Sequence, residues 1–305
     1  MNAFAGSSAD EIYRSGPESL IAASQVVVAG RVAHYARQVT SESAGAEPIP
    51  LTWTLSGHIG QPIAIKGGLP TPPLVFSRRE RSMLVPPDPD VPDWQSDLGE
   101  VRPDGPVVAF YGAATDQRPG TVLPAGEDPA ALVALLRDLA TIQAIKSPEQ
   151  RTPAWLDYLR RGGSEAGRMA ALRSLIGMGV SWSTLAPVLD HLSADPATGA
   201  RLREFTFGIV AFAVAQERFG EQQGPAVQFL CRAFLAAPDA ATALMDLLHL
   251  KLVLRYTGQT EGRAARLPLE RQIIDALNQR AAAGAWSAEL AEQYRQIRRT
   301  HPAVR

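Results

Sequence analysis

The chain has 305 residues, 46% of them hydrophobic and 20% charged, with a formal net charge of −1. This composition excludes a disordered chain, and the length is ample for two domains with cores of their own. The balanced charge gives no general attraction to nucleic acid or to anionic membranes. The single Cys231 excludes an internal disulfide, and its apolar surroundings predict a buried thiol rather than a nucleophile.

The strongest strand signal in the chain runs from Gln25 to Val39. Within it Val26, Val28 and Val32 share one face, which is the period of a half-buried strand. Gly30 in its middle predicts a bulge or a tight bend, the device that lets a small sheet curl.

Short apolar segments with no helices between them follow this strand. Turn-forming pairs such as Ser56-Gly57 separate them, which predicts an antiparallel sheet closed as a small barrel or sandwich. Residues 86–105, rich in proline and acidic residues, predict a long loop. The further strands are expected at Leu51–Leu55, Pro62–Lys66, Leu74–Arg78, Ser82–Val85 and Pro106–Gly112.

The segment Ser24–Val32 reads Ser-x-Val-Val-Val-x-Gly-x-Val. It resembles the opening strand of the small OB-like β-barrel found at the head of some bacterial extracytoplasmic proteins. The resemblance covers about 100 residues and implies a barrel, with no substrate attached to it. It also favours an extracytoplasmic location, with a signal removed from the chain, over a cytoplasmic one.

The composition and the spacing of apolar residues change near residue 120. After this point the chain is rich in Ala and Leu, and its apolar residues recur at helical spacing. Asp128-Pro129 is a helix cap followed by Pro at the first helical position. Phe205–Ala215 is apolar all round and predicts a central buried helix. The expected helices begin at Asp128 and continue as Pro153–Arg161, Glu165–Ile176, Ser183–Leu192, Ala200–Phe219, Ala226–Leu235, Ala240–Tyr256, Pro268–Ala283 and Ser287–Arg298.

One pair of these helices resembles a HEAT repeat, with Trp155–Arg161 as its first helix and Ser164–Gly179 as its second. The positions that carry the resemblance are Arg168, Ala170, Ala171 and Leu175. In that family the arginine helps neighbouring repeats to stack and the alanines allow close helix approach. Further repeats are expected near Arg201 and Ala241, in an open solenoid or a compact bundle.

The expected fold is therefore α+β, with an N-terminal antiparallel β-barrel or sandwich and a C-terminal HEAT-like stack or bundle of helical hairpins. The expected organisation is a flexible tail at 1–16, an OB-like domain at 17–117, a linker at 118–127, a helical domain at 128–300 and a tail at 301–305.

No catalytic residue, metal site or cofactor is predicted. The histidines are scattered, and Asp246 with His249 offers two ligands on one helix where a metal site needs three or four. A polar, partly exposed pair is the preferred interpretation of these two residues. No phosphate-binding loop is present, and the longest apolar run has eleven residues, too few to span a membrane.

Two surface features are candidates for partner binding. Arg78, Arg79 and Arg81 form the densest basic spot of the barrel, although the acidic loop after them could neutralise it. Trp94 lies in that loop, where an aromatic side chain either pins the loop down or anchors a partner.

The sequence is compatible with three functions. The preferred one is a non-enzymatic protein-binding scaffold, or an inhibitor of immunity type, that uses the helical surface to bind another protein. The alternative is an enzyme with its site in a cleft between the domains. Its acids or bases could be Asp93, Asp97 and Glu100 of the loop, or Glu217 at the end of the apolar helix. The third is single-strand nucleic-acid binding by the barrel, which the charge balance disfavours. The sequence leaves the oligomeric state open.

Overall fold

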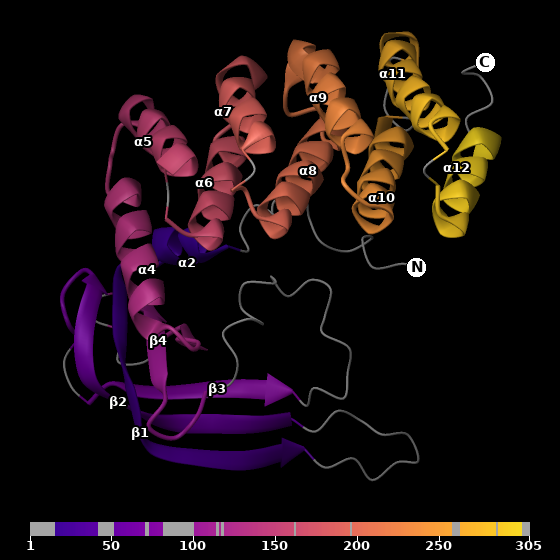
Figure 1. The fold of residues 1–305 in the computed structure, drawn as a ribbon. Helices are drawn as coiled ribbons and strands as arrows, with labels where there is room; N and C mark the ends of the chain where they lie inside the picture. The colour runs from indigo at the N-terminus through magenta and orange to yellow at the C-terminus, as the bar shows by residue number, and fades with distance from the viewer. Residues whose placement is uncertain are drawn as a thin grey trace. The chain divides into compact units, whose positions relative to one another are not determined.

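The computed structural model describes residues 16–41, 52–70, 73–81, 101–113, 116, 119–161, 163–195, 197–257, 263–284 and 286–300. The chain divides into two compact units, Met1–Arg151 and Thr152–Arg305. The first unit contains an antiparallel sheet with helices and the second is helical (Figure 1). The α+β class predicted from the sequence is confirmed.

The sheet of the first unit has the strand order β3-β2-β1-β4-β5, and every neighbouring pair is antiparallel. The two outer strands, β3 and β5, also approach each other. The sheet is therefore curled rather than flat. Its strands are β1 (Val26–Ser41), β2 (Thr52–Lys66), β3 (Val75–Arg81), β4 (Pro106–Tyr111) and β5 (Thr121–Pro124).

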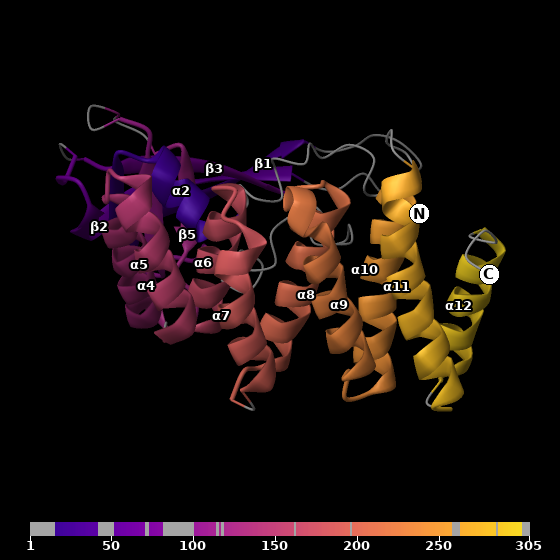
Figure 2. The same ribbon diagram turned by 90° about the horizontal axis from the view of Figure 1, so that it is seen from above.

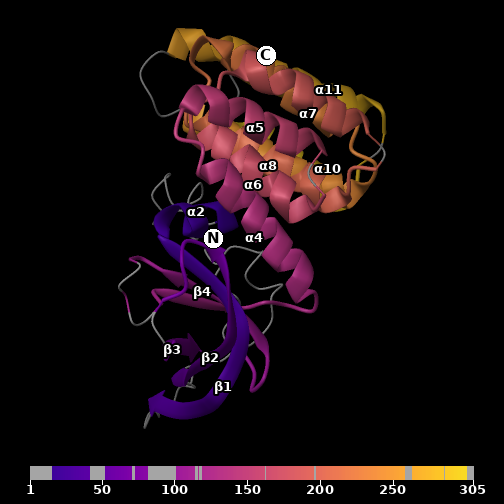
Figure 3. The same ribbon diagram turned by 90° about the vertical axis from the view of Figure 1, so that its left-hand side faces the viewer.

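The predicted irregularity at Gly30 is present. The register between β1 and β2 shifts between Ala29 and Arg31, and β1 bends along its length (Figure 3). A Cβ atom on Gly30 would lie 2.4 Å from Cγ2 of Ile59 and 2.8 Å from the carbonyl oxygen of Gly60. Glycine is thus needed here because the neighbouring strand passes too close for any side chain.

Strand β2 corrects the sequence analysis, which expected two strands separated by a turn at Ser56-Gly57. The two segments form one continuous strand, and Gly57 lies inside it, opposite Phe76. A Cβ atom on Gly57 would stand 3.0 Å from the Phe76 ring. Gly57 leaves space for the ring of Phe76 and does not form a turn. The sequence alone does not distinguish these two reasons for a glycine.

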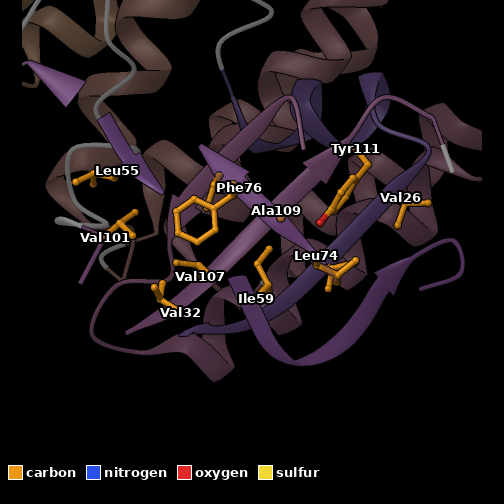
Figure 4. Close-up of a cluster of buried hydrophobic side chains, with 12 residues drawn as sticks. Val26, Val32, Leu55, Ile59, Leu74, Phe76, Val101, Val107, Ala109 and Tyr111 are labelled. Carbon is orange, nitrogen blue, oxygen red and sulfur yellow. The ribbon is translucent and has the colours of Figure 1, made fainter. Parts of the chain in front are cut away.

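The interior of the curled sheet is filled by apolar side chains from all five strands (Figure 4). The three valines predicted to share a face of β1 belong to this core, whereas Arg31 and Arg37 are exposed. Tyr111 is fully buried, and its hydroxyl has no hydrogen-bond partner among the described residues. The core comprises Val26, Val28, Val32, Leu55, Ile59, Leu74, Phe76, Val101, Val107, Ala109, Tyr111 and Val122.

Among the described residues of the first unit, helices α2 (Pro17–Ala23) and α4 (Pro129–Gln143) pack against each other. Helix α4 also packs against β2. As predicted, Asp128 caps α4, its carboxylate accepting a hydrogen bond from the backbone N–H of Ala131 at 3.0 Å. Strand β5 lies within residues 118–127, the range that the sequence analysis assigned to a linker.

The side chain of Lys66 joins the end of β2 to the end of α2. Its ammonium donates hydrogen bonds to the carbonyls of Ile21 and Ser24. Partial burial lowers its pKa. A cation at the C-terminal end of a helix satisfies carbonyls that have no partner inside the helix.

The helices of the second unit pair into antiparallel hairpins that stack in chain order. Helices α7, α9 and α11 line one side of the stack, and α6, α8, α10 and α12 line the other (Figures 1 and 2). The helices are α5 (Pro148–Arg161), which crosses the boundary between the units, α6 (Glu165–Gly177), α7 (Trp182–Ala194), α8 (Ala200–Ala215), α9 (Gln223–Leu235), α10 (Ala240–Thr257), α11 (Arg263–Ala282) and α12 (Ala288–Thr300), with a short 3₁₀ helix, η1 (Gly220–Gln222).

Helix α8 is the centre of this unit, as its apolar sequence predicted. It contacts α6, α7, α9 and α10. The main contacts link each hairpin to its nearest neighbours, the pattern of a stack rather than of a closed bundle. Several predicted ends differ. Helix α8 stops at Ala215 instead of Phe219, α5 begins at Pro148 instead of Pro153, and α11 begins at Arg263, so that Pro268 lies inside it.

Candidate functional site

The candidate residues of the first unit are only partly described. Residues 78, 79 and 81 lie on β3, where their backbones pair with residues 55, 54 and 52 of β2. Trp94, Asp93, Asp97 and Glu100 lie outside the described residues, so the predictions attached to them remain predictions. The predicted strand Ser82–Val85 lies outside them as well.

The residues that carry the HEAT resemblance all lie on α6. Ala170, Ala171 and Leu175 are fully buried, and Arg168 is half-buried. Ser164 caps this helix through a hydrogen bond that the backbone N–H of Gly167 donates to its hydroxyl at 3.1 Å. Nearby, the Arg173 guanidinium stands 5.0 Å from the centre of the Phe205 ring on α8, so a cation and an aromatic ring link the two helices.

The most unusual polar group of the second unit is Asp246, near the start of α10. It is an acidic side chain that is only 4% exposed. Burial raises its pKa to about 7; Glu204 and Asp239 act in the same direction, and Arg280 opposes them. The sequence predicted a partly exposed residue here. Asp246 is instead buried, because its turn of α10 faces α8 and α9.

His249, one turn further along α10, packs against α8. Its ring lies beside Gly208, and its centre is 6.0 Å from that of the Phe207 ring. Burial lowers the pKa of His249, an effect that the Met245 carbonyl and the Glu204 carboxylate oppose. The imidazole is therefore favoured in its neutral form. In the described residues no group of three or more His, Cys, Asp or Glu side chains is placed to hold a metal ion.

Arg280 is a buried cation that the sequence analysis did not single out. From α11 it donates hydrogen bonds to the carbonyls at the end of α9: to Phe234 at 2.6 Å, to Leu235 at 3.2 Å and to Ala237 at 3.4 Å. Its guanidinium also stands 5.2 Å from the centre of the Phe234 ring. Because these partners are more than forty positions away in the chain, no local pattern marks this arginine.

Cys231 is buried on α9, as predicted. Burial raises the pKa of its thiol to about 12, and the thiol contacts the carbonyl of Gln272 on α11 at 3.6 Å. A thiol with so high a pKa is almost wholly protonated at neutral pH, and nucleophilic attack requires the thiolate. This residue is therefore a packing residue.

The outward side of α10 carries an apolar stripe. Met245 is 39% exposed and Leu248 is 41% exposed, Ala241 is exposed one turn before them, and Leu252 is half-buried one turn after them. On the adjoining helix α8, Phe205 and Phe212 are half-buried. Arg255 is exposed at the end of the α10 stripe. We call these residues of α8 and α10 the α8/α10 face.

Comparisons with known proteins give no match to this chain, whether to a protein-family model, a curated protein or a solved structure. Among the described helices, none combines the length and the apolar character that a membrane crossing requires.

Proposed function

We propose that this protein is a non-enzymatic binding protein whose α8/α10 face holds another protein. The observation that carries the proposal is the exposed stripe of Met245 and Leu248. These residues are three positions apart and therefore lie on the same side of α10. Contiguous exposed apolar surface is unusual on a soluble protein and marks interaction sites. Methionine also adapts its shape to a partner more readily than other apolar residues do.

The arrangement of the helices supports the same proposal. HEAT-like arrays stack helical hairpins so that one row of helices presents an extended surface to a partner. The paired helices of the second unit and the buried Ala170 and Ala171 of α6 are consistent with such an array. Scaffolds and immunity-like inhibitors both belong to this class, and both predict a protein ligand.

The test is affinity capture from the native host, with the tagged full-length chain as bait. The binding-face variant is the double substitution Met245→Glu and Leu248→Glu. Its matched control is Gln228→Glu with Gln279→Glu, which places the same two charges at exposed positions on α9 and α11. A partner retained by the wild type and the control, but reduced by about tenfold or more for the α10 variant, supports the proposal.

If both variants retain the partner equally, the binding site does not include Met245 and Leu248 of α10. A folded chain that retains no protein above background would contradict the proposal as a whole. Circular dichroism of all three proteins verifies that the helices are intact.

A second candidate function is single-strand nucleic-acid binding by the sheet of the first unit. The strand order β3-β2-β1-β4-β5, with the outer strands near each other, is that expected of an OB-like barrel. Such barrels bind strands along β2 and β3, and β3 carries Arg78, Arg79 and Arg81. Binding of a labelled oligonucleotide that weakens steeply between 50 and 200 mM salt would support this candidate. Absent or salt-insensitive binding would exclude it.

A further inference from the structure

A cavity of about 120 Å³, partly open to solvent, lies in the second unit, where α7 and α9 end and α8 and α10 begin. Phe207 and Phe229 contribute aromatic rings to its wall, and Ala236, Ala237 and Pro238 contribute the loop between α9 and α10. Arg280 holds this loop by its hydrogen bonds to the carbonyls of α9 and of Ala237. The cavity is therefore bounded by packed helices and by an anchored loop.

Two buried polar side chains line this cavity. One is Asp246, of which only 4% is exposed to solvent. The other is Thr198, which is equally buried and whose Oγ1 atom has no hydrogen-bond partner among the described residues. Buried polar groups in folded proteins nearly always have partners. Thr198 is an exception on this cavity, beside the buried carboxylate of Asp246, and a guest that offers hydrogens would complete both side chains.

The charges around the cavity favour a positive guest. Asp246 and Glu204 are acidic, and Glu204 lies at the exposed edge on α8. Of the nearby cations, Arg203 donates to the backbone carbonyl of Asp195. Arg280 donates through its two terminal nitrogens to carbonyls at the end of α9 and of Ala237, while its Nε has no partner among the described residues and its charge acts on Asp246. The faces of Phe207 and Phe229 suit either the aliphatic part of a guest or its charge.

We infer that this cavity binds a small organic cation: a primary ammonium on a short aliphatic chain, with Asp246 as its counter-ion and Thr198 as a further acceptor. The size of the cavity sets the size of the ligand. A protein cavity of about 150 Å³ accommodates benzene, so the guest has about five non-hydrogen atoms. This inference is independent of the proposed protein-binding face, because the cavity lies within the stack rather than on its apolar stripe.

Ligand binding is coupled to the ionisation of Asp246. Its carboxyl has a pKa of about 7, raised by burial and by Glu204 and Asp239 and lowered by Arg280. Arg203 also lines the cavity, and His249 lies one turn along α10 with a lowered pKa. An ammonium ion prefers the ionised carboxylate, so affinity rises with pH below about 7 and levels off above it.

The experiment is isothermal titration of the full-length chain with butylammonium at pH 8, with 1-butanol as a neutral probe of similar shape. A guest of this size is expected to bind with a dissociation constant on the order of 1 mM, and the alcohol about tenfold more weakly. Asp246→Asn is expected to weaken butylammonium binding about tenfold or more. The control Asp275→Asn, an exposed change on α11, leaves the affinity unchanged.

Three outcomes overturn the inference: equal affinities for the amine and the alcohol, an Asp246→Asn protein that binds butylammonium as the wild type does, or no binding at ligand concentrations of about 20 mM. If Asp246→Asn does not fold, the wild type still decides the matter. Its affinity for butylammonium must fall as the pH is lowered from 8 to 5.5, by up to about tenfold per pH unit below 7. An affinity that does not change with pH contradicts the role of Asp246.

Discussion

The Nε2 atom of His249 lies 2.9 Å from the point where a Cβ atom would stand on Gly208. Glycine in the middle of α8 therefore makes room for an imidazole ring of α10, and the two central helices approach closely at this point. Helix α8 tolerates the glycine although glycine costs a helix about 1 kcal/mol relative to alanine.

This contact predicts a double-mutant cycle. Gly208→Ala should destabilise the wild type by about 1 kcal/mol, because the strain of displacing a packed ring exceeds the gain in helix propensity. In a His249→Ala background the same substitution should stabilise by up to about 1 kcal/mol, since the ring is gone. Urea unfolding of the four proteins gives the coupling, and an equal effect in both backgrounds would contradict the contact.

Arg280 provides a prediction about the end of α9. Arg280→Met should lower the free energy of unfolding by roughly 2–4 kcal/mol, because it leaves three backbone carbonyls without their donor. The control is Arg232→Met, which removes an exposed ion pair with Asp190 and should cost no more than about 1 kcal/mol. Hydrogen exchange of the α9 and α11 amides measures both, and similar losses would argue against a special role for Arg280.

The raised pKa of Asp246 predicts how stability changes with pH. The folded value is about 7 and the ordinary value is 3.8. Between these values the folded protein binds a proton that the unfolded chain releases, so this residue's contribution to stability falls as pH rises from about 4 to about 7. The slope is up to about 1.4 kcal/mol per pH unit, and above pH 7 the destabilisation is complete.

Comparison with Asp246→Asn isolates this contribution, because His249, with its lowered pKa, destabilises the protein in the opposite direction as pH falls below 6.5. At pH 8 the variant should be more stable than the wild type by roughly 2–4 kcal/mol, and near pH 4 the difference should vanish. The measurement is urea unfolding of both proteins across this range. A difference that stays constant with pH would show that Asp246 titrates normally.

In the first unit, Gly30→Ala should disrupt the pairing of β1 with β2. The added Cβ would meet Ile59 and the backbone of Gly60 at less than 3 Å, so the expected loss is roughly 2–3 kcal/mol. Gly60→Ala is the matched control, since its nearest neighbour would be 3.7 Å away. Hydrogen exchange of the β1 and β2 amides reports on both. Equal protection in the two variants would mean that the strand can relax around Gly30.

The local signals were reliable where the cause of the structure is local. Asp128 caps α4 because its side chain reaches an N–H three residues away, and the alternating valines of β1 identify its buried face. They failed at Ser56-Gly57, where the glycine accommodates the ring of Phe76 from another strand. They also failed at Pro268, which was predicted to begin a helix and lies inside α11.

The candidate sites were less accessible to sequence reasoning than the fold. Asp246 and His249 were recognised as a pair on one helix, but the sequence did not show that Asp246 is buried or that His249 packs against α8. Thr198, Gly208 and Arg280 carry no signal of their own, because each acquires its role from helices that are distant in the sequence. The apolar stripe of Met245 and Leu248 reads like any buried helix face until its neighbours are placed.

The order of residues by itself determined that a sheet is followed by helices. The spacing of apolar residues, the helix caps and the helix-breaking residues all act within a few positions of the chain. Only tertiary packing decided which apolar residues are covered, which acid is buried, and where a cavity remains. These outcomes depend on which turns of helices such as α8 and α10 contact each other. The burial and the pKa of a side chain are set by such contacts and not by the sequence of either helix alone.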